Sequence, residues 1–415
     1  MNVISLVLPG YAFSKKVIRR CLRILGYLVL HTLRALYFPA AIILFFGKIR
    51  FLTGGNYPFR IGHLALEPYC YIVTGLFGWH QNYKGILMVP AKKSVNPFFT
   101  RLWGKYFIII NSDICYYFIY PLYKYKMLQI NIKSTFINKR EREVVIPANY
   151  IINKKYRQEF GGKPLLELYA SDKEKGQNCL EELGVPKGAW FIALHVREGG
   201  YLQHLNYHSY RDADVKTYLT ACDEVIQRGG WAIRLGDPSM KPLPTMDRVV
   251  DYAHSTFKSD WMDIFLLTQC RFILGTTSGP IAVSAIFGKP CVLTNFTPMG
   301  HGAFQYGDLW IPKLYYLNKE ERMLSIKECM SKKYRGISRS ENFKNAGITL
   351  IDNTNDEIRG VTIEMLNRYD GKTDYTEEDE ILQENFMTEL RREPLFETEA
   401  RIGKDFLKKY KFLLD

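Results

Sequence analysis

Two segments of the chain place phosphate-binding groups at the ends of predicted strands. The first, residues 271–293 (RFILGTTSGPIAVSAIFGKPCVL), reads as strand, Gly/Ser/Thr loop, short helix and strand. Pro280 suits the first position of the helix. The free backbone N–H groups and the positive helix end therefore face an anion at Thr276, Thr277, Ser278 and Gly279. This pattern predicts a phosphate cradle, with an ordinary Ser/Thr helix cap as the alternative. No G-K-[ST] or G-x-G-x-x-G motif is present, which argues against a P-loop ATPase or a dinucleotide site.

The second segment, LHVREGGY, runs from an apolar strand directly into a glycine pair. His195 and Arg197 are two residues apart, so on a strand they share one face. The planar fork of an arginine grips two phosphate oxygens at once. We therefore expect His195, Arg197 and Gly199 to bind the same phosphate, although a strand-end histidine is often only a structural donor.

Other polar residues have simpler interpretations. Gly236 and Asp237 form a turn by default, but they follow an apolar strand at the edge where ligands bind, and we include them among the candidate ligand-binding residues. Asp212 and Asp214 match the D-x-D pattern of metal-nucleotide sites, yet they directly precede a helix and are expected to cap it. His204 and His208 lack the further ligands of a zinc site, so we expect no metal.

The elements of the second half alternate between strand and helix. Helices are expected over 215–227, 260–270 and 280–287, and strands over 190–196, 231–235, 248–252, 271–274 and 290–293. This alternation predicts a doubly wound, Rossmann-like parallel sheet. Ligands of such sheets bind at the carboxyl ends of the strands, which here are the loops after 196, 235 and 274.

The first half has a less regular pattern. Apolar runs at 86–89, 107–110 and 114–123 suggest strands, residues 56–66 a short strand that meets a helix at Gly62 and His63, and residues 163–183 a helix. A turn cluster at 184–188 suggests a domain boundary. From about 315 the chain reads as charged and helical. We predict four segments: 1–50, 51–184, 185–345 and 346–415.

Length and composition limit the class of protein. At 415 residues, and roughly 150 residues per domain, two or three domains are expected. A hydrophobic content of 47% excludes a disordered chain. The eight cysteines are scattered and form no C-x-x-C, which favours a reducing compartment over a zinc ribbon or a disulfide scaffold.

Positive charge is concentrated at the N-terminus, where residues 1–66 hold nine Lys/Arg and no acid. Residues 24–46 are long enough to span a bilayer but include His31, Arg34 and Pro39. On a helical wheel, basic residues from 15 to 34 share one side. We expect this helix to lie in the headgroup layer of an anionic membrane, on the cytoplasmic face of the inner membrane. A true span and a helix packed on its own domain, in a cytoplasmic protein, are the alternatives, and no nucleic-acid partner is expected.

Several motifs resemble a bacterial family of glycosyltransferases tied to surface-carbohydrate synthesis. They are HVREGGY…SYRDADVKTYL, GGWAIRLGDPSMKPLP and SDWMDIFLLTQCRFILGTTSGP, with RIGHLAL and RIGKDFL near the two ends. The first is similar to the H-x-R loop of GDP-fucose-using fucosyltransferases, whose arginine holds the donor diphosphate, and this implies the same role for Arg197. Those enzymes often have Gly-Asp where this chain has Gly199 and Gly200, which argues against fucose as the sugar.

The resemblance implies a GT-B-like α/β fold. Two Rossmann-like domains would face each other across a cleft, with the acceptor on the N-terminal one and the nucleotide-sugar on the C-terminal one. We expect a metal-independent glycosyltransferase without a cofactor, whose acceptor is a cell-surface glycan or a lipid-linked glycan. Glu198 and His63 are the candidates for the catalytic base. A nucleotide-sugar epimerase, or a non-catalytic membrane- or RNA-binding protein, are the rival hypotheses.

Overall fold

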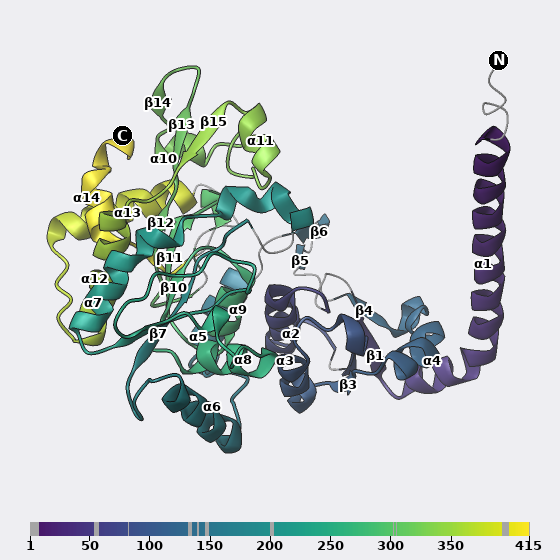
Figure 1. Cartoon of the computed structure of the whole chain (residues 1–415). Coiled ribbons are helices and arrows are strands. Elements are labelled where there is room, and N and C mark those ends of the chain that lie inside the picture. The colour runs from purple at the N-terminus through teal and green to yellow at the C-terminus, as the bar shows by residue number, and fades with distance from the viewer. Residues whose placement is uncertain are drawn as a thin grey trace, which may run out of the picture.

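The computed structural model describes residues 8–53, 58–81, 83–131, 135–138, 141–145, 149–199, 203–301, 303, 305–391 and 398–414. Two parallel sheets organise the chain, and helices surround each of them (Figure 1). We call the parts built around these sheets the N-lobe and the C-lobe. The expected α/β architecture of two Rossmann-like units, preceded by an N-terminal helix, is confirmed.

The N-lobe sheet has four parallel strands in the order β3-β2-β1-β4. Its strands are β1 (Ile49–Thr53), β2 (Lys84–Met88), β3 (Ile108–Ile110) and β4 (Gln129–Asn131). The helices of this half are α1 (Leu8–Phe46), α2 (Ile61–Leu76), α3 (Pro97–Leu102), α4 (Asp113–Tyr123), α5 (Asn149–Phe160) and α6 (Ala170–Glu182). A separate hairpin pairs β5 (Thr135–Asn138) with β6 (Glu141–Val145).

The C-lobe sheet has seven parallel strands in the order β16-β12-β11-β10-β7-β8-β9. They are β7 (Phe191–His195), β8 (Trp231–Arg234), β9 (Val249–Val250), β10 (Ile273–Gly275), β11 (Cys291–Phe296), β12 (Leu309–Pro312) and β16 (Arg401–Ile402). The central strands are buried on both faces, as their continuous apolar sequences predict.

Helices cover both faces of this sheet and extend to the C-terminal end. They are α7 (Leu219–Gln227), α8 (Asp260–Gln269), α9 (Gly279–Ile286), α10 (Ile326–Cys329), α11 (Ser340–Asn345), α12 (Asn355–Tyr369), α13 (Glu377–Arg391) and α14 (Lys404–Lys409). A small antiparallel sheet joins β14 (Arg322–Met323), β13 (Leu314–Leu317) and β15 (Ile348–Ile351). The region after 315 is therefore not purely helical, and β15 and β16 lie within the expected C-terminal helical segment.

Three sequence expectations for the first half were wrong. The aromatic run at 114–123 forms helix α4 rather than a strand, because Ser112 caps its first turn by accepting the Cys115 N–H. The helix expected over 163–183 begins only at Ala170. Residues before it are extended because the Leu165 carbonyl accepts hydrogen bonds from Lys105 and Tyr106 instead of a helical N–H. The short strand expected within 56–66 is also wrong, because residues 58–59 form a turn and the first strand, β1, ends at Thr53. The helix expected at Gly62 is present as α2, which begins at Ile61.

Helix α1 is packed on the N-lobe only at its C-terminal end. Ala41 is fully buried there with β1, β2 and the end of α4, and Tyr37 and Leu44 pack against the same cluster. Pro39 lies inside the helix, which bends at this end (Figure 1). The apolar residues from 17 to 36 that the structure describes are largely exposed.

The two lobes share one continuous hydrophobic core. Helix α2 of the N-lobe packs against α9 of the C-lobe, and α3 packs against α8. Asn96, at the start of α3, donates a hydrogen bond across this junction to the Asp260 carbonyl, at 2.8 Å. The first turns of α2 and α9 are thereby fixed beside each other.

Candidate anion-binding site between the lobes

The start of α9 has polar groups without protein partners. Ser278 is the N-cap residue, but its side chain makes no capping hydrogen bond. In the part of the chain that the structure describes, the buried Thr277 Oγ1 and Ser278 Oγ have no hydrogen-bond partner. An unpaired buried hydroxyl is costly, so a ligand that bonds to it is favoured. Two hydroxyls and the positive end of an eight-residue helix are thus available to an anion.

Arg197 is held beside this loop by its backbone and its side chain. Its N–H donates to Thr276 Oγ1 at 2.9 Å, and the Thr276 N–H donates to the His195 carbonyl at 3.1 Å. The Arg197 Nε–H donates to Asp212 Oδ1 at 2.8 Å. Burial raises the pKa of the Asp212 carboxyl, while the Arg197 charge opposes that shift. Asp212 therefore orients the Arg197 guanidinium, whereas the sequence predicted that Asp212 caps a helix.

The segment Gln203–Arg211 adds two more groups to this region. Among the described residues, the buried His208 Nδ1 and Arg211 Nε have no hydrogen-bond partner. Burial lowers the pKa of His208 to about 4, and the charges of Arg211, Arg197, Arg60 and Arg339 act in the same direction. His208 is consequently neutral at pH 7, and the four arginines share one electrostatic environment.

The N-lobe contributes to the same place through the start of α2. Arg60 Nη2 donates to the Tyr207 hydroxyl at 3.2 Å. A Cβ atom placed on Gly62 would lie 3.1 Å from the Gly279 Cα, so the two helices touch backbone to backbone. Arg197 is therefore close both to the loop before α9 and to the 203–211 segment. That segment contacts Arg60, and the helix that follows Arg60 touches α9.

His63, the next residue of α2, forms a pair with Glu67. The distance from His63 Nδ1 to Glu67 Oε1 is 2.7 Å, and the two side chains are 41% and 7% exposed. A carboxylate on Nδ1 fixes the ring and leaves Nε2 directed elsewhere, as in histidines that act as general bases. The sequence analysis did not pair these residues, although their spacing of four on one helix is a signal that could have found the pair.

The other expected site residues have structural partners. His195 is buried, its Nδ1 lies 3.3 Å from the Leu235 carbonyl, and burial lowers its pKa to about 4. Glu198 Oε2 accepts from the Lys241 N–H at 3.2 Å and lies 3.5 Å from Arg234 Nη2, so it is engaged within its own lobe. Asp237 accepts from the Ser239 N–H at 3.0 Å, as a turn residue does.

The two glycines differ in their surroundings. A Cβ on Gly199 would lie 3.5 Å from Asp212 Oδ2, which places Gly199 beside the arginine cluster. A Cβ on Gly236 would lie 2.6 Å from Met240 Sδ, so Gly236 permits close packing of its own loop. Gly200 lies outside the described residues.

Asp214 caps the 3₁₀ segment Val215–Tyr218, because its carboxylate accepts the Lys216 N–H at 3.0 Å. Asp212 instead pairs with Arg197, so only one of the two carboxylates is a cap. Within the described ranges, no group of three or more His, Cys, Asp or Glu side chains is arranged to hold a metal ion.

Sequence reasoning missed Arg60, His208 as an anion-site residue, Arg211 and Arg339. Arg211 directly precedes the D-x-D pair, and Arg60 is the first residue of the RIGHLAL motif. Both are weak signals. Nothing in the sequence around Arg339 indicates its role, because it approaches only through the folding of a distant segment.

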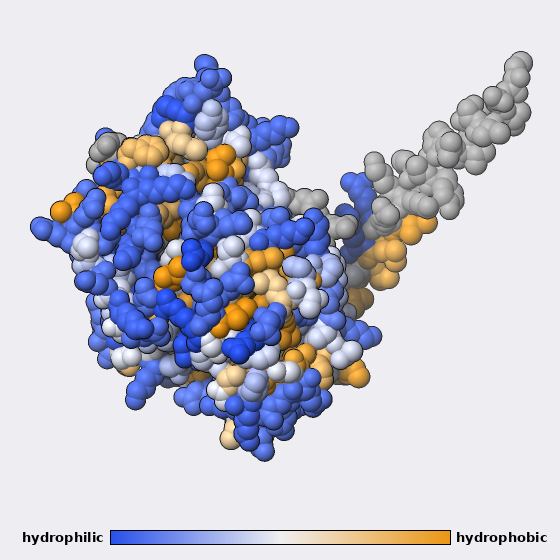
Figure 2. Space-filling view, turned by 60° about the vertical axis from the view of Figure 1, so that its left-hand side comes forward, coloured by the Kyte–Doolittle hydropathy of each residue, from blue (hydrophilic) through white to orange (hydrophobic). Residues whose placement is uncertain are grey.

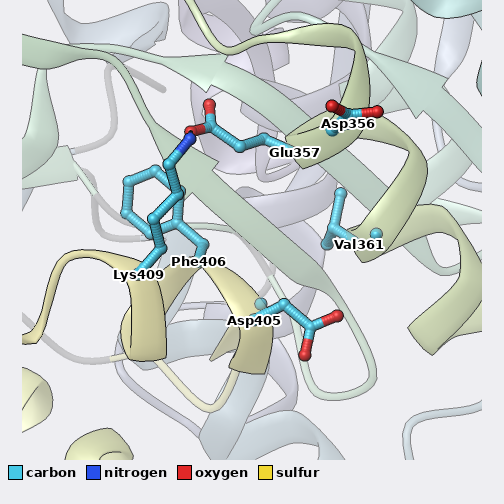
Figure 3. A pocket seen from close by; sticks show the side chains of 8 residues that line it. Asp356, Glu357, Val361, Asp405, Phe406 and Lys409 are labelled. Atoms are coloured by element: carbon cyan, nitrogen blue, oxygen red, sulfur yellow. The ribbon is translucent and has the colours of Figure 1, made fainter.

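A cavity of about 190 Å³ lies elsewhere, between α12 and α14 (Figure 3). Asp356, Glu357 and Asp405 line it together with Lys409, whose Nζ is paired with Glu357 at 2.6 Å. Three carboxylates against one paired lysine repel phosphate, so we do not assign the donor to this cavity.

No protein-family model matches the chain, and no curated protein matches it significantly. Solved structures with a related arrangement include a glycosyl transferase family 9 protein from Veillonella parvula. It is 10% identical over 59% of this chain and 79% of that one, with a TM-score of 0.38. The ADP-heptose lps heptosyltransferase II of E. coli is 12% identical over 59% and 83%, with a TM-score of 0.36. The E. coli heptosyltransferase WaaC with ADP is 10% identical over 64% and 90%, with a TM-score of 0.28. These similarities concern chain architecture only.

Proposed function

We propose that the protein is a glycosyltransferase that takes a sugar from a nucleotide-diphosphate donor. The observation that carries this proposal is the set of unpaired hydroxyls at the start of α9 beside Arg197, with Arg60, Arg211 and Arg339 gathered around the neighbouring His208. A diphosphate supplies the acceptor oxygens that the unpaired Thr277, Ser278 and Arg211 groups require. The solved structures named above are glycosyltransferases, but the site, rather than that likeness, supports the proposal.

The chemistry follows from where charge develops. When the bond between the sugar and the diphosphate breaks, the leaving diphosphate becomes more negative. Fixed cations and a helix N-terminus stabilise that charge in the transition state more than in the ground state. In this proposal Arg197, Arg211 and the start of α9 provide this stabilisation, and no metal is required.

The acceptor hydroxyl must lose a proton as it attacks. We assign the base to His63, because Glu67 orients its ring and Gly62 brings it next to the donor helix. Glu198 is the weaker candidate, since the Lys241 N–H and Arg234 already engage it. The acceptor in this proposal is a lipid-linked or cell-surface glycan.

The membrane part of the proposal concerns α1. Residues Arg20–Phe46 are long and apolar enough to cross a bilayer by length and composition, and almost none of this stretch is buried. We propose that α1 holds the enzyme on an anionic membrane, at the cytoplasmic face. The packing of Ala41 shows that only its last turns serve the N-lobe's own core.

Calorimetric titration with ADP, UDP and GDP, and with the matching nucleosides, tests the donor site. The solutions contain EDTA, because the proposed site uses no metal. We expect at least one nucleoside diphosphate to bind. Arg197→Ala should lower the affinity for that nucleoside diphosphate by about tenfold or more and leave the affinity for the nucleoside unchanged. Turnover should fall by roughly 100- to 1000-fold in Arg197→Ala. Arg197→Lys should also lose most activity, because it lacks the planar fork.

Arg228→Ala is the matched control. Arg228 is also paired with an aspartate, Asp370, at 2.9 Å, but it follows the last residue of α7, at the edge of the sheet where β8 begins, opposite the strand ends that carry Arg197. It should bind and turn over like the wild type. Failure of every nucleoside diphosphate to bind, or wild-type affinity in Arg197→Ala, contradicts the proposed donor site.

A further inference from the structure

Helix α4 exposes one apolar face. Ile114, Tyr117 and Phe118 are 76%, 70% and 70% exposed. Their spacing of three and four residues places them side by side on the helix surface. Pro121 and Leu122, near its end, are buried. Burying three large side chains away from water is favourable, so this exposed face indicates a binding surface.

The other side of α4 packs toward α1, where Tyr116, Ile119 and Tyr120 join the cluster around Ala41. The Tyr125 hydroxyl, just after α4, donates to the Arg34 carbonyl of α1, and the Phe38 and Tyr125 rings lie 6.3 Å apart. Exposed hydrophobic residues gather where the N-terminal helix leaves the body (Figure 2). The two helices are therefore joined at this point, and each has exposed apolar side chains.

A crevice of about 290 Å³ lies between these helices, lined by His31, Arg34, Ala35, Phe38 and Tyr125. Its walls combine a cation with aromatic and small apolar groups. The Arg34 guanidinium carbon is 5.3 Å from the Tyr125 ring centroid. This chemistry suits a phosphate that is attached to an apolar body.

The composition around α4 fits the same kind of partner. Lys124 Nζ lies 4.6 Å from the Tyr120 ring centroid, and Lys126 is exposed. Tyrosine rings with a polar tip, and lysines that extend past apolar surface, are typical of the membrane–water interface. The first 66 residues carry nine basic residues and no acid, which favours an anionic surface over a zwitterionic one.

We propose that α4, together with α1, docks the N-lobe on an anionic lipid bilayer. The α4 face enters the boundary between headgroups and acyl chains, and the Arg34 crevice receives a lipid headgroup phosphate. This inference rests on the proposed membrane association of α1. Because α2 and His63 belong to the same lobe, the docked enzyme holds its proposed acceptor side at the membrane, where a lipid-linked acceptor resides.

Fluorescence of an environment-sensitive label on the full chain tests the proposal. Cys21 and Cys115 are exposed and Cys179 is half-buried, so serine replaces all three before Phe118→Cys is introduced and labelled with NBD. A second protein keeps Cys21 as the α1 reporter. A third carries Ile381→Cys on α13, where Ile381 is 54% exposed but belongs to the C-lobe.

With phosphatidylglycerol vesicles, we expect a blue shift and an intensity gain at positions 118 and 21, and none at 381. A response at 21 without one at 118 overturns the α4 proposal and leaves the α1 association standing. No response at either position overturns both. A change at 118 without vesicles that grows with protein concentration makes this face a contact between two copies, which also overturns the proposal.

Substitutions give an independent measure. Ile114→Ser, Tyr117→Ser and Phe118→Ser together should lower partitioning onto these vesicles by about tenfold or more, with unchanged nucleoside-diphosphate affinity. The matched control is Ile381→Ser with Phe412→Ser, which removes exposed apolar side chains from the C-lobe and should change neither. Arg34→Gln should reduce the preference for phosphatidylglycerol over phosphatidylcholine. Equal partitioning of the triple variant and its control contradicts the proposal.

Discussion

At the scale of single residues, the orientation of His63 depends on Glu67. The buried carboxylate lies 2.7 Å from one ring nitrogen, and the preceding residue, Gly62, touches the start of α9. A histidine in that position is useful as a base only while its ring is fixed, because proton transfer requires alignment with the acceptor hydroxyl.

We therefore expect His63→Ala to lower kcat by roughly 100- to 10000-fold. Glu67→Gln should lower kcat less, because the ring remains and only its orienting charge is lost. Steady-state kinetics combined with donor titration checks both variants. If His63→Ala changes only donor affinity, His63 binds substrate and the base lies elsewhere.

The donor side of the site was partly predictable from sequence. Arg197 and the 276–279 loop follow neighbouring strands, and the carboxyl ends of parallel strands meet at one sheet edge. Arg60 and Arg339 could not be predicted, because they reach the cluster from the other lobe and from α11's N-cap position. Side-chain partners were also beyond the sequence: neither the pairing of Arg197 with Asp212 nor that of Glu198 with Arg234 has a local pattern.

At the scale of elements, α1 has two parts with different environments. Its C-terminal turns cover Phe51 and Met88 of the N-lobe sheet through Ala41. The helix ends where Arg50 donates to the carbonyls of Leu44 and Phe45, at 3.3 and 3.1 Å. The described apolar residues before Leu36 cover nothing in the structure.

Removal of residues 1–32 should therefore leave the free energy of unfolding unchanged within about 0.5 kcal/mol. Removal of residues 1–46 also deletes Ala41 and uncovers the sheet, and should cost more than about 2 kcal/mol. Urea unfolding of the two shortened proteins beside the full chain makes the comparison. Equal stability of both would mean that the contacts around Ala41 contribute little.

Strands and helices of the C-lobe were easier to predict than those of the N-lobe. The 190–196 and 271–274 runs are short, apolar and bounded by turn residues, which is typical of buried parallel strands. The 114–123 run has the same residue types, and its aromatic and β-branched side chains favour a strand locally. It is nevertheless a helix: Ser112 caps its first turn and Leu122 is buried, while Ile114, Tyr117 and Phe118 stay exposed.

At the scale of the whole molecule, the burial of His195 links stability to pH. Burial lowers the pKa of His195 to about 4, whereas a histidine in the unfolded chain titrates near 6.5. Between these values the unfolded chain binds the proton and the folded protein does not. The free energy of unfolding is therefore unaffected by His195 above about pH 6.5, and His195 lowers it as the pH falls from 6.5 toward 4.

We expect this residue to remove about 2 kcal/mol between pH 7.5 and pH 5. Urea unfolding of the wild type and of His195→Gln, at both pH values, measures the difference. The variant should lose less stability on acidification than the wild type, since glutamine does not titrate. Parallel losses in the two proteins would show that His195 is protonated as easily when folded as when unfolded.

The backbone contact between Gly62 and Gly279 fixes the distance between the two lobes at the proposed site. Because neither residue has a side chain, the first turns of α2 and α9 are already in backbone contact, and the lobes cannot approach further at this point. We therefore expect any closure over a donor at the proposed site to pivot at this contact, with Arg60 and His63 close to the pivot. A methyl group at either glycine would push the first turns of α2 and α9 apart. The proposed base, His63, would then shift relative to the proposed diphosphate site while both helices stayed intact.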